Sequence, residues 1–281
     1  MKKFLINIIA VIMLVAACFS FTACGEKTNY RVEVKVEVYN GVNDTEEYTL
    51  YVDFYHNFAP YTVNTILSYI AQGYYNDAIF YQNKNHSAQI MMGDLAYTDG
   101  KLEQKTIKTS LIGEFEKNGL MGSTLKNERG AIGLWRTWTA DDDLYKTSNK
   151  ESMNSGRATW YIPTGNASTY NKNFCVFAKL NLDIEANADA LEAIENAFTD
   201  IDDFIDYEIY YTGEYDENQP DNNYGLTFNS IEKDLFVESE IDNLFVAEGE
   251  QFVAYNHYTV RVPVIADTNT PAVRISSMII R

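Results

Sequence analysis

Most of the residue patterns that perform catalysis are missing from this sequence. Its three histidines, His56, His86 and His257, include no pair at the helical spacing of a metal site, and HExxH and CxxC are both absent. Neither a phosphate-binding glycine loop nor the GxSxG turn of a serine hydrolase is present. The sequence therefore predicts no metal and no cofactor, and it leaves binding, scaffolding, or catalysis that needs no nucleophile.

One short stretch carries chemical groups in an unusual place. Residues 128–137 read ERGAIGLWRT, in which a short apolar run stops at a tryptophan beside an arginine. A buried strand explains Ala131, Ile132 and Leu134, but it does not explain why Trp135 and Arg136 stand together at its end. Either the two side chains border a binding site, or the tryptophan closes the core and the arginine points to solvent.

The first residues predict export. A lysine pair is followed by an almost wholly apolar run to Ala17 and then by small residues with cysteine, as in a secretory signal peptide. The pattern resembles a bacterial lipoprotein signal, in which a cysteine after small residues becomes the lipidated first residue. Cys24 is preferred over Cys18 because polar sequence begins directly after it. An uncleaved transmembrane anchor is the alternative, and both interpretations place the rest of the chain outside the cytoplasm.

The net charge limits the classes of partner, and the cysteine content limits the disulfides that the chain can form. With 22 Lys and Arg against 40 Asp and Glu the formal net charge is −18, and loss of the two lysines in the signal makes it −20. A body this acidic repels nucleic acid. If Cys24 is acylated, only Cys175 remains in the mature chain, so no internal disulfide can form. Cys175 lies in the apolar run FCVFAKL, where we expect a buried small hydrophobe, with a reactive thiol as the alternative.

The elements that must position these groups are mostly strands. In RVEVKVEV at 31–38 four valines alternate with charged residues, which predicts a half-buried antiparallel strand. The period becomes helical at 60–72, where Pro60 suits the first turn, and again at 189–198. Further strand-like runs are found at 47–55, 78–82, 88–92, 130–135, 158–162, 174–180, 252–262 and 273–280. This order predicts a closed β-barrel with two helices covering its openings.

The exported part is predicted to form one domain. Residues 1–23 are the signal peptide, 24–30 a short tether, and 31–281 a single domain with insertions at about 138–154 and 199–250. The second insertion is strongly acidic. Its DIDDFID segment at 200–206 lacks the glycine of a calcium loop, so we interpret it as a solvated acidic face, with ion binding as the alternative.

Four groups of segments, in this order, resemble the cyclophilin family of peptidyl-prolyl isomerases. APYTVNTILSYIAQGYYNDAIFYQ resembles the helix, Gly-Tyr turn and strand that end in the family's Phe-His-Arg, and AQIMMGD resembles its Phe-Met-Xaa-Gln-Gly-Gly-Asp segment. IGEF with ERGAIGLWR resembles Gly-Glu-Phe and Arg-Gly-Ala-Leu-Ala-Met-Ala-Arg. SGRATWYI with YNKNFCVFAKL resembles Ser-Gln-Phe-Phe-Ile and His-Val-Val-Phe-Gly-Lys-Val. The resemblance covers most of residues 31–281 apart from the insertions.

The resemblance implies a fold, an activity and partners. The fold would be mainly β, a closed eight-stranded antiparallel barrel with two capping helices, and Trp135 and Arg136 would lie on the rim of a groove for proline-containing peptides. The activity would be rotation about Xaa-Pro bonds, whose barrier is roughly 18–20 kcal/mol, by holding the twisted amide better than the planar one. The partners would be proline-containing peptides or unfolded exported proteins, and a membrane reached through the lipid anchor at Cys24.

The sequence departs from the family at its polar positions. The family's catalytic arginine aligns with Gln82, its two glutamines with Met91 and Thr159, its pocket leucine and histidine with Tyr170 and Phe174, and its proline-pocket aromatic with Tyr161. A neutral amide donor is worth about half a charge-assisted one, and losing about 1–2 kcal/mol in the transition state slows a reaction roughly tenfold or more. We therefore take Gln82 and Arg136 as the candidate catalytic residues, with Arg136 supplying a guanidinium from across the groove.

Two functions follow from these residues. The first is a membrane-anchored extracytoplasmic prolyl isomerase of low activity that assists the folding of exported proteins. The alternative is a catalytically inactive cyclophilin-like peptide-binding module of the cell surface, which the replaced polar residues favour, since a fold does not by itself transfer activity. A purely structural surface lipoprotein, the third possibility, would bind no peptide.

Overall fold

A computed structural model describes residues 29–41, 44–83, 88–98, 101–106, 108–120, 125–136, 153–212, 225–230 and 258–281. The predicted signal peptide with Cys24, nearly all of the first insertion and most of the second lie outside these ranges. Within the described ranges no helix has the length and hydropathy needed to cross a membrane.

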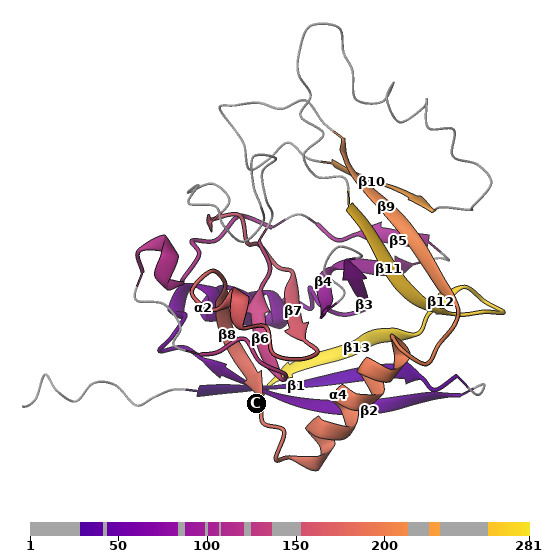
Figure 1. Ribbon diagram of the computed structural model, residues 1–281, viewed down its shortest axis with the longest axis horizontal. Coiled ribbons are helices and arrows are strands. Elements are labelled where there is room, and N and C mark those ends of the chain that lie inside the picture. Colours follow the sequence, from indigo (N-terminus) through magenta and orange to yellow (C-terminus); the bar gives the residue numbers. More distant parts are fainter. Residues whose placement is uncertain are drawn as a thin grey trace, which may run out of the picture.

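Eight antiparallel strands close into a barrel, as the sequence predicts (Figure 1). Around the ring the order is β3-β13-β1-β2-β8-β6-β7-β4, and the pairing of β3 with β4 completes it. The strands are β1 (Asn29–Tyr39), β2 (Thr45–Tyr55), β3 (Ala78–Asn83), β4 (Gln89–Thr98), β6 (Ala131–Leu134), β7 (Trp160–Pro163), β8 (Cys175–Leu180) and β13 (Val273–Ile280). Each of them overlaps a strand-like run of the sequence.

Alternate residues of the strands fill the barrel. In β1 the four valines Val32, Val34, Val36 and Val38 are at most 3% exposed. The charged residues of β1 face outward and form ion pairs with β2 and β13. Ion pairs at the surface contribute little to folding stability. Burial of the valines therefore fixes the register, because a slip of one residue would turn all four to solvent.

Two helices cover the barrel. Helix α2 (Pro60–Ala71) begins at the proline, as predicted, and the backbone amides of Tyr61 and Thr62 donate to the buried carboxylate of Glu114 at 3.1 and 2.7 Å. Helix α4 (Glu185–Ala197) starts four residues before the predicted run and contacts mainly β2. The negative charge of Glu114 at the start of α2 also suits the helix dipole.

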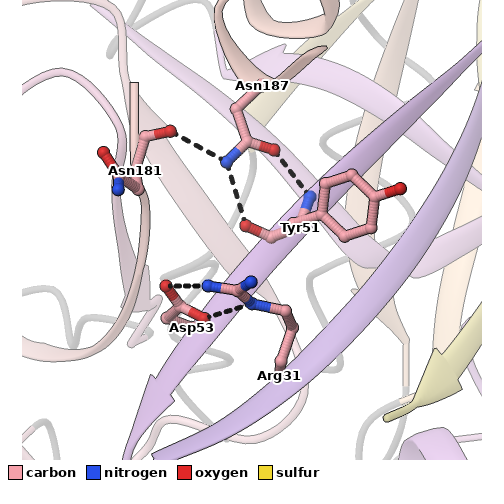
Figure 2. Close-up of polar contacts among 5 residues, drawn as sticks. All are labelled: Arg31, Tyr51, Asp53, Asn181 and Asn187. Atoms are coloured by element: carbon pink, nitrogen blue, oxygen red, sulfur yellow. Dashed lines mark hydrogen bonds and ion pairs between the residues drawn. The ribbon is translucent and has the colours of Figure 1, made fainter. Parts of the chain in front are cut away.

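One buried asparagine attaches α4 to the sheet. Asn187 accepts a hydrogen bond from the Tyr51 amide at 2.6 Å and donates to the carbonyls of Tyr51 and Asn181 at 3.1 and 3.0 Å (Figure 2). Strand β8 pairs with β2 only from Val52 to Phe54. The side chain of Asn187 therefore satisfies the β2 backbone at the point where β8 ends.

A second group of strands lies outside the ring. β9 (Phe204–Thr212), β10 (Gly225–Ser230) and β11 (Tyr258–Ile265) form an antiparallel ribbon that joins the end of β3 through β11, and β12 (Thr270–Pro271) pairs with β11. In Figure 1 this ribbon rises from one side of the barrel. The run predicted at 252–262 is thus a strand beginning at Tyr258, outside the ring. The second insertion supplies β9 and β10, whereas its boundaries and those of the domain stay predictions.

Smaller elements complete the described chain. β5 (Lys101–Gln104) forms a hairpin with β4, and the 3₁₀ helices η2 (Glu116–Asn118) and η3 (Ser168–Tyr170) lie in the loops.

Apolar side chains form two clusters, one on each face of the curved sheet. The first fills the barrel and contains Trp160 at its centre among other aromatic rings. The second lies on the outer face and consists of Ile79, Tyr81, Met91, Leu95, Leu102, Tyr161, Tyr170, Phe174, Tyr207, Val260, Val262 and Val264. Because Tyr207 and the valines come from β9 and β11, the ribbon covers part of the outer face.

Candidate functional site

The strands β4, β6 and β7 bring the predicted binding residues to the outer face. Met91 of β4 lies opposite Tyr161 of β7, and Tyr161 in turn lies opposite Gly133 of β6. Met91 and Tyr161 are at most 2% exposed, whereas Trp135, directly after β6, is half-buried. Their neighbours in the chain turn into the barrel, as strand alternation requires.

Four of the predicted residues form one aromatic cluster, which we call the outer aromatic cluster: Trp135, Tyr161, Tyr170 and Phe174. Trp135 stacks on Phe174 with ring centroids 5.4 Å apart and planes 23° apart. The ring edges of Tyr161 meet the other three rings at 5.5–5.8 Å. Trp135 is the half-buried member of the cluster, since the other three are at most 5% exposed. It therefore offers solvent an aromatic surface that is held rigidly from below.

A glycine and an asparagine hold Tyr161 in this cluster. A Cβ atom at Gly133 would lie 2.2–2.4 Å from the Tyr161 ring and hydroxyl, so only glycine leaves room for the ring. The Tyr161 hydroxyl donates to the Oδ1 of Asn127, a buried residue whose own amide groups bind Asn171. Burial raises the pKa of Tyr161 well above its usual value, while the nearby Arg136 lowers it. Asn127 was not among the predicted site residues, because no local pattern marks it.

Arg136 does not lie on a rim, which corrects the sequence-based expectation. Its side chain is 3% exposed, its Nε donates to the Asn173 carbonyl at 3.2 Å, and its guanidinium lies 4.9 Å from the Phe174 ring and 5.6 Å from Phe115. The chain alternates at the end of β6, so Trp135 faces outward and Arg136 inward. Arg136 thus supports Phe174 from behind.

A polar group that the sequence did not single out borders the cluster. The Tyr81 hydroxyl donates to the Asp94 carboxylate at 2.7 Å, and the Thr159 side chain donates to the same carboxylate. Burial raises the pKa of Asp94, and these two hydrogen bonds partly oppose that rise. The predicted residue Thr159 also accepts the Trp135 amide through its carbonyl at 2.8 Å. Alternation along FYQ could have identified Tyr81, because it puts Tyr81 rather than Gln82 on the outer face.

Gln82 is placed differently from the other predicted residues. Tyr81 belongs to the outer cluster and Phe80 to the barrel interior, so alternation assigns Gln82 to the interior series. Across the strand pair it lies directly opposite Arg261 of β11. Gln82 is half-buried, and its catalytic role stays a prediction.

Metal and thiol chemistry find little support in the described part of the chain. There, no group of three or more His, Cys, Asp or Glu side chains could hold a metal ion. Cys175 is buried as expected, contacts the Thr62 hydroxyl at 3.6 Å, and has its pKa raised by burial to about 12. Among the acidic residues at 200–206, Asp206 pairs with Arg261 at 3.4 Å. What the outer face offers chemically is an aromatic surface next to a carboxylate that accepts two hydroxyl donors.

Comparison with known proteins gives one family. A family model described as cyclophilin-type peptidyl-prolyl cis-trans isomerase matches residues 42–211, more than half of the chain. The match runs from the start of β2 to β9, and so includes every residue of the outer aromatic cluster. No curated protein matches the chain.

Two solved structures are similar at low identity. One is a cyclophilin-type peptidyl-prolyl cis-trans isomerase of Cryptosporidium parvum, at 19% identity and a TM-score of 0.39, with 58% of this chain and 84% of that one covered. The other is the same protein in the presence of the dipeptide Ala-Pro, at 18% identity and a TM-score of 0.38, with the same coverage.

Proposed function

Because the chain belongs to the cyclophilin-type peptidyl-prolyl cis-trans isomerase family, we propose that it is a slow prolyl isomerase, anchored by lipid outside the cytoplasm, that acts on exported proteins. The outer aromatic cluster is the observation that supports this proposal best. Trp135 is half-buried and stacked on Phe174, so a prolyl ring can lie against it without displacing the buried rings below. Aromatic surfaces of this kind are a common way to bind proline.

The cluster can lower the rotation barrier without a nucleophile. A planar amide is more polar than a twisted one, because resonance separates charge between its oxygen and nitrogen. An apolar surface that removes water from the prolyl amide therefore disfavours the planar ground state relative to the twisted transition state. In this proposal Trp135 supplies that surface, and the buried Phe174, Tyr161 and Tyr170 hold it in place.

The low rate follows from the positions of the polar side chains. The family's catalytic arginine aligns with Gln82, which alternation turns away from the cluster, and the Arg136 guanidinium is buried behind Phe174. Losing a charge-assisted contact of about 1–2 kcal/mol in the transition state lowers the rate roughly tenfold or more. The same loss supports the second candidate function, peptide binding without catalysis.

The location outside the cytoplasm rests on the sequence alone. The apolar N-terminal run followed by small residues and Cys24 supports cleavage and lipidation, after which a short tether joins the body to the membrane. Exported chains refold at that surface, and their Xaa-Pro bonds isomerise slowly without help. A tethered isomerase there would meet clients as they emerge.

The test is exchange spectroscopy by NMR on a short Xaa-Pro peptide with the soluble body from residue 25. We expect faster cis-trans exchange than in buffer, together with shifted peptide resonances. Shifted resonances without faster exchange would support the binding module. If the protein causes neither faster exchange nor shifted resonances, both functions are excluded and a structural lipoprotein remains.

Two variants locate the source of any acceleration. Arg136→Lys keeps a cation but loses the planar stacking on Phe174, so a lower rate would show that support of Phe174 matters. Gln82→Arg restores the family's residue. We expect little gain from it, because alternation turns position 82 away from the cluster, and a large gain would contradict that placement.

A further inference from the structure

The large apolar side chains that remain exposed gather at one end of the barrel. Among the described residues they are Tyr61, Ile112, Leu120, Ile279 and Ile280, with exposed fractions of 38–65%. We call these five residues the anchor-end patch. Scattered exposed apolar residues are ordinary, but a group of them at one place marks an interaction surface.

The strand ends show that Ile279 and Ile280 lie where the chain enters the barrel. Ile280 pairs with Val32 and Ile279 with Glu33, both near the start of β1, and the Arg281 amide donates to the Arg31 carbonyl at 2.8 Å. In Figure 1 the C-terminus lies near the start of β1. The end of β13 and the beginning of β1 therefore share one end of the barrel.

The other three patch residues belong to the same end. Asn29 pairs with Tyr55, the last residue of β2, and a short turn then leads directly to Tyr61 at the start of α2. Glu114 accepts the Tyr61 amide, which draws the loop containing Ile112 to this end, and the loop continues through η2 to Leu120. The backbone positions of all five residues thus belong to the end of the barrel at which β1 begins.

The predicted anchor lies close to this end. Five residue steps separate Cys24 from Asn29, so the acylated cysteine can lie at most roughly 18 Å from the start of β1. The opposite end of β1 is about 35 Å further, since its 11 residues rise about 3.3 Å each. A short tether therefore holds the end with the patch, and not the end with the ribbon, near the bilayer.

Acidic side chains near the start of β1 are paired with basic ones. The formal net charge of the chain is −18, which opposes contact with acidic headgroups. Here, however, Asp53 pairs with Arg31 at 2.8 Å and Glu33 with Arg281 at 2.7 Å. Glu114 is occupied by helix amides. The carboxylates that would repel a bilayer are thus individually compensated.

We propose that the anchor-end patch is a membrane-docking surface, through which the lipidated protein rests on the bilayer. Tyrosine and isoleucine at the edge of a domain suit the interfacial zone of a bilayer. This inference rests on the lipid anchor of the proposed function, and it does not depend on isomerase activity.

The test uses the mature protein extracted from membranes and reconstituted in vesicles of phosphatidylethanolamine and phosphatidylglycerol. Single cysteines replace Tyr61, Ile280 or, as the control at the far end, exposed Asp267, and carry a fluorophore. Cys175 is buried and stays unlabelled. We expect brominated lipids to quench labels at 61 and 280 several-fold more than the label at 267. Equal or absent quenching at the three positions would overturn the inference.

Two further measurements separate the docking surface from the predicted lipid anchor on which it rests. They also separate bilayer contact from binding of another molecule at the patch. Intact mass reports whether Cys24 carries lipid: without lipid the anchor and the docking surface both fail, whereas lipid with no quenching overturns the docking surface alone. Without vesicles, labels at 61 and 280 that respond to a proline-containing peptide, or to protein concentration, would show that a client or a second copy occupies the patch.

Discussion

Gly133 and Trp135, two residues apart, explain the unusual end of the ERGAIGLWRT stretch. Gly133 leaves room for the Tyr161 ring, and Trp135 turns outward onto Phe174. The sequence could predict that these aromatic residues belong together, because the resemblance aligned them with one pocket. It could not predict that Arg136 is buried, since the direction of a residue just past a strand depends on rings contributed by distant segments.

The fit of Tyr161 against Gly133 predicts the effect of a single methyl group. Gly133→Ala puts a Cβ atom 2.2–2.4 Å from Tyr161, so the ring must move and its bond to Asn127 must break. We expect a loss of about 1–3 kcal/mol in the free energy of unfolding, measured by urea denaturation, together with weaker binding of proline-containing peptides. Gly165→Ala is the matched control, because a Cβ atom there meets nothing within 4 Å. Equal stability of the two variants would contradict the packing described here.

Cys175 predicts a pH dependence with a definite sign. Burial raises the pKa of the folded thiol from 9.0 to about 12, so the folded state keeps a proton that the unfolded chain loses first. The stability that the folded state gains by keeping this thiol protonated is complete below about pH 9, and it is lost as the pH rises towards 12. We expect the free energy of unfolding to fall above pH 9, and Cys175→Ala to make that fall less steep. Rapid alkylation of the folded protein at pH 8 would show that the thiol is not buried.

Helices and strands were easier to predict than the bonds between them. Pro60 marks the start of α2, but the carboxylate that satisfies its first amides comes from Glu114, more than fifty residues away. Asn187 likewise looked like an ordinary polar residue before a helical run, yet it completes the hydrogen bonding of β2. Local periodicity identifies elements because it reflects which face is buried. It contains no information about which distant backbone a buried polar group will meet.

Asn187 allows this element-scale role to be measured. Asn187→Ala leaves the Tyr51 amide and carbonyl and the Asn181 carbonyl without their partner, so we expect a loss of about 2–4 kcal/mol in the free energy of unfolding. Asn196→Ala, an exposed position of the same helix, should change stability far less. Hydrogen exchange should show faster opening of α4 in the Asn187 variant. Equal stabilities for the two alanine variants would mean that packing alone attaches α4.

At the scale of the whole molecule, the order of elements was enough to predict the closed barrel. Eight strand-like runs and two helical runs account for the ring β3-β13-β1-β2-β8-β6-β7-β4 and for α2 and α4. The ribbon of β9, β10 and β11 was not predicted as a unit, because its strands are separated by long polar segments and pair out of chain order. Its contribution of Tyr207 and valines to the outer face was hidden for the same reason.

The central claim is that the outer aromatic cluster binds proline through Trp135. The most direct test is the affinity of the soluble body for an Ala-Pro peptide and for the matching Ala-Ala peptide, by NMR titration, in wild type, Trp135→Ala and Tyr51→Ala. Tyr51 is an aromatic residue of β2 outside both apolar clusters. We predict tighter binding of the proline peptide by wild type and Tyr51→Ala, and at least about fivefold weaker binding by Trp135→Ala, from the loss of one aromatic contact. Equal affinity for the two peptides, or an unchanged affinity in Trp135→Ala, would contradict the claim.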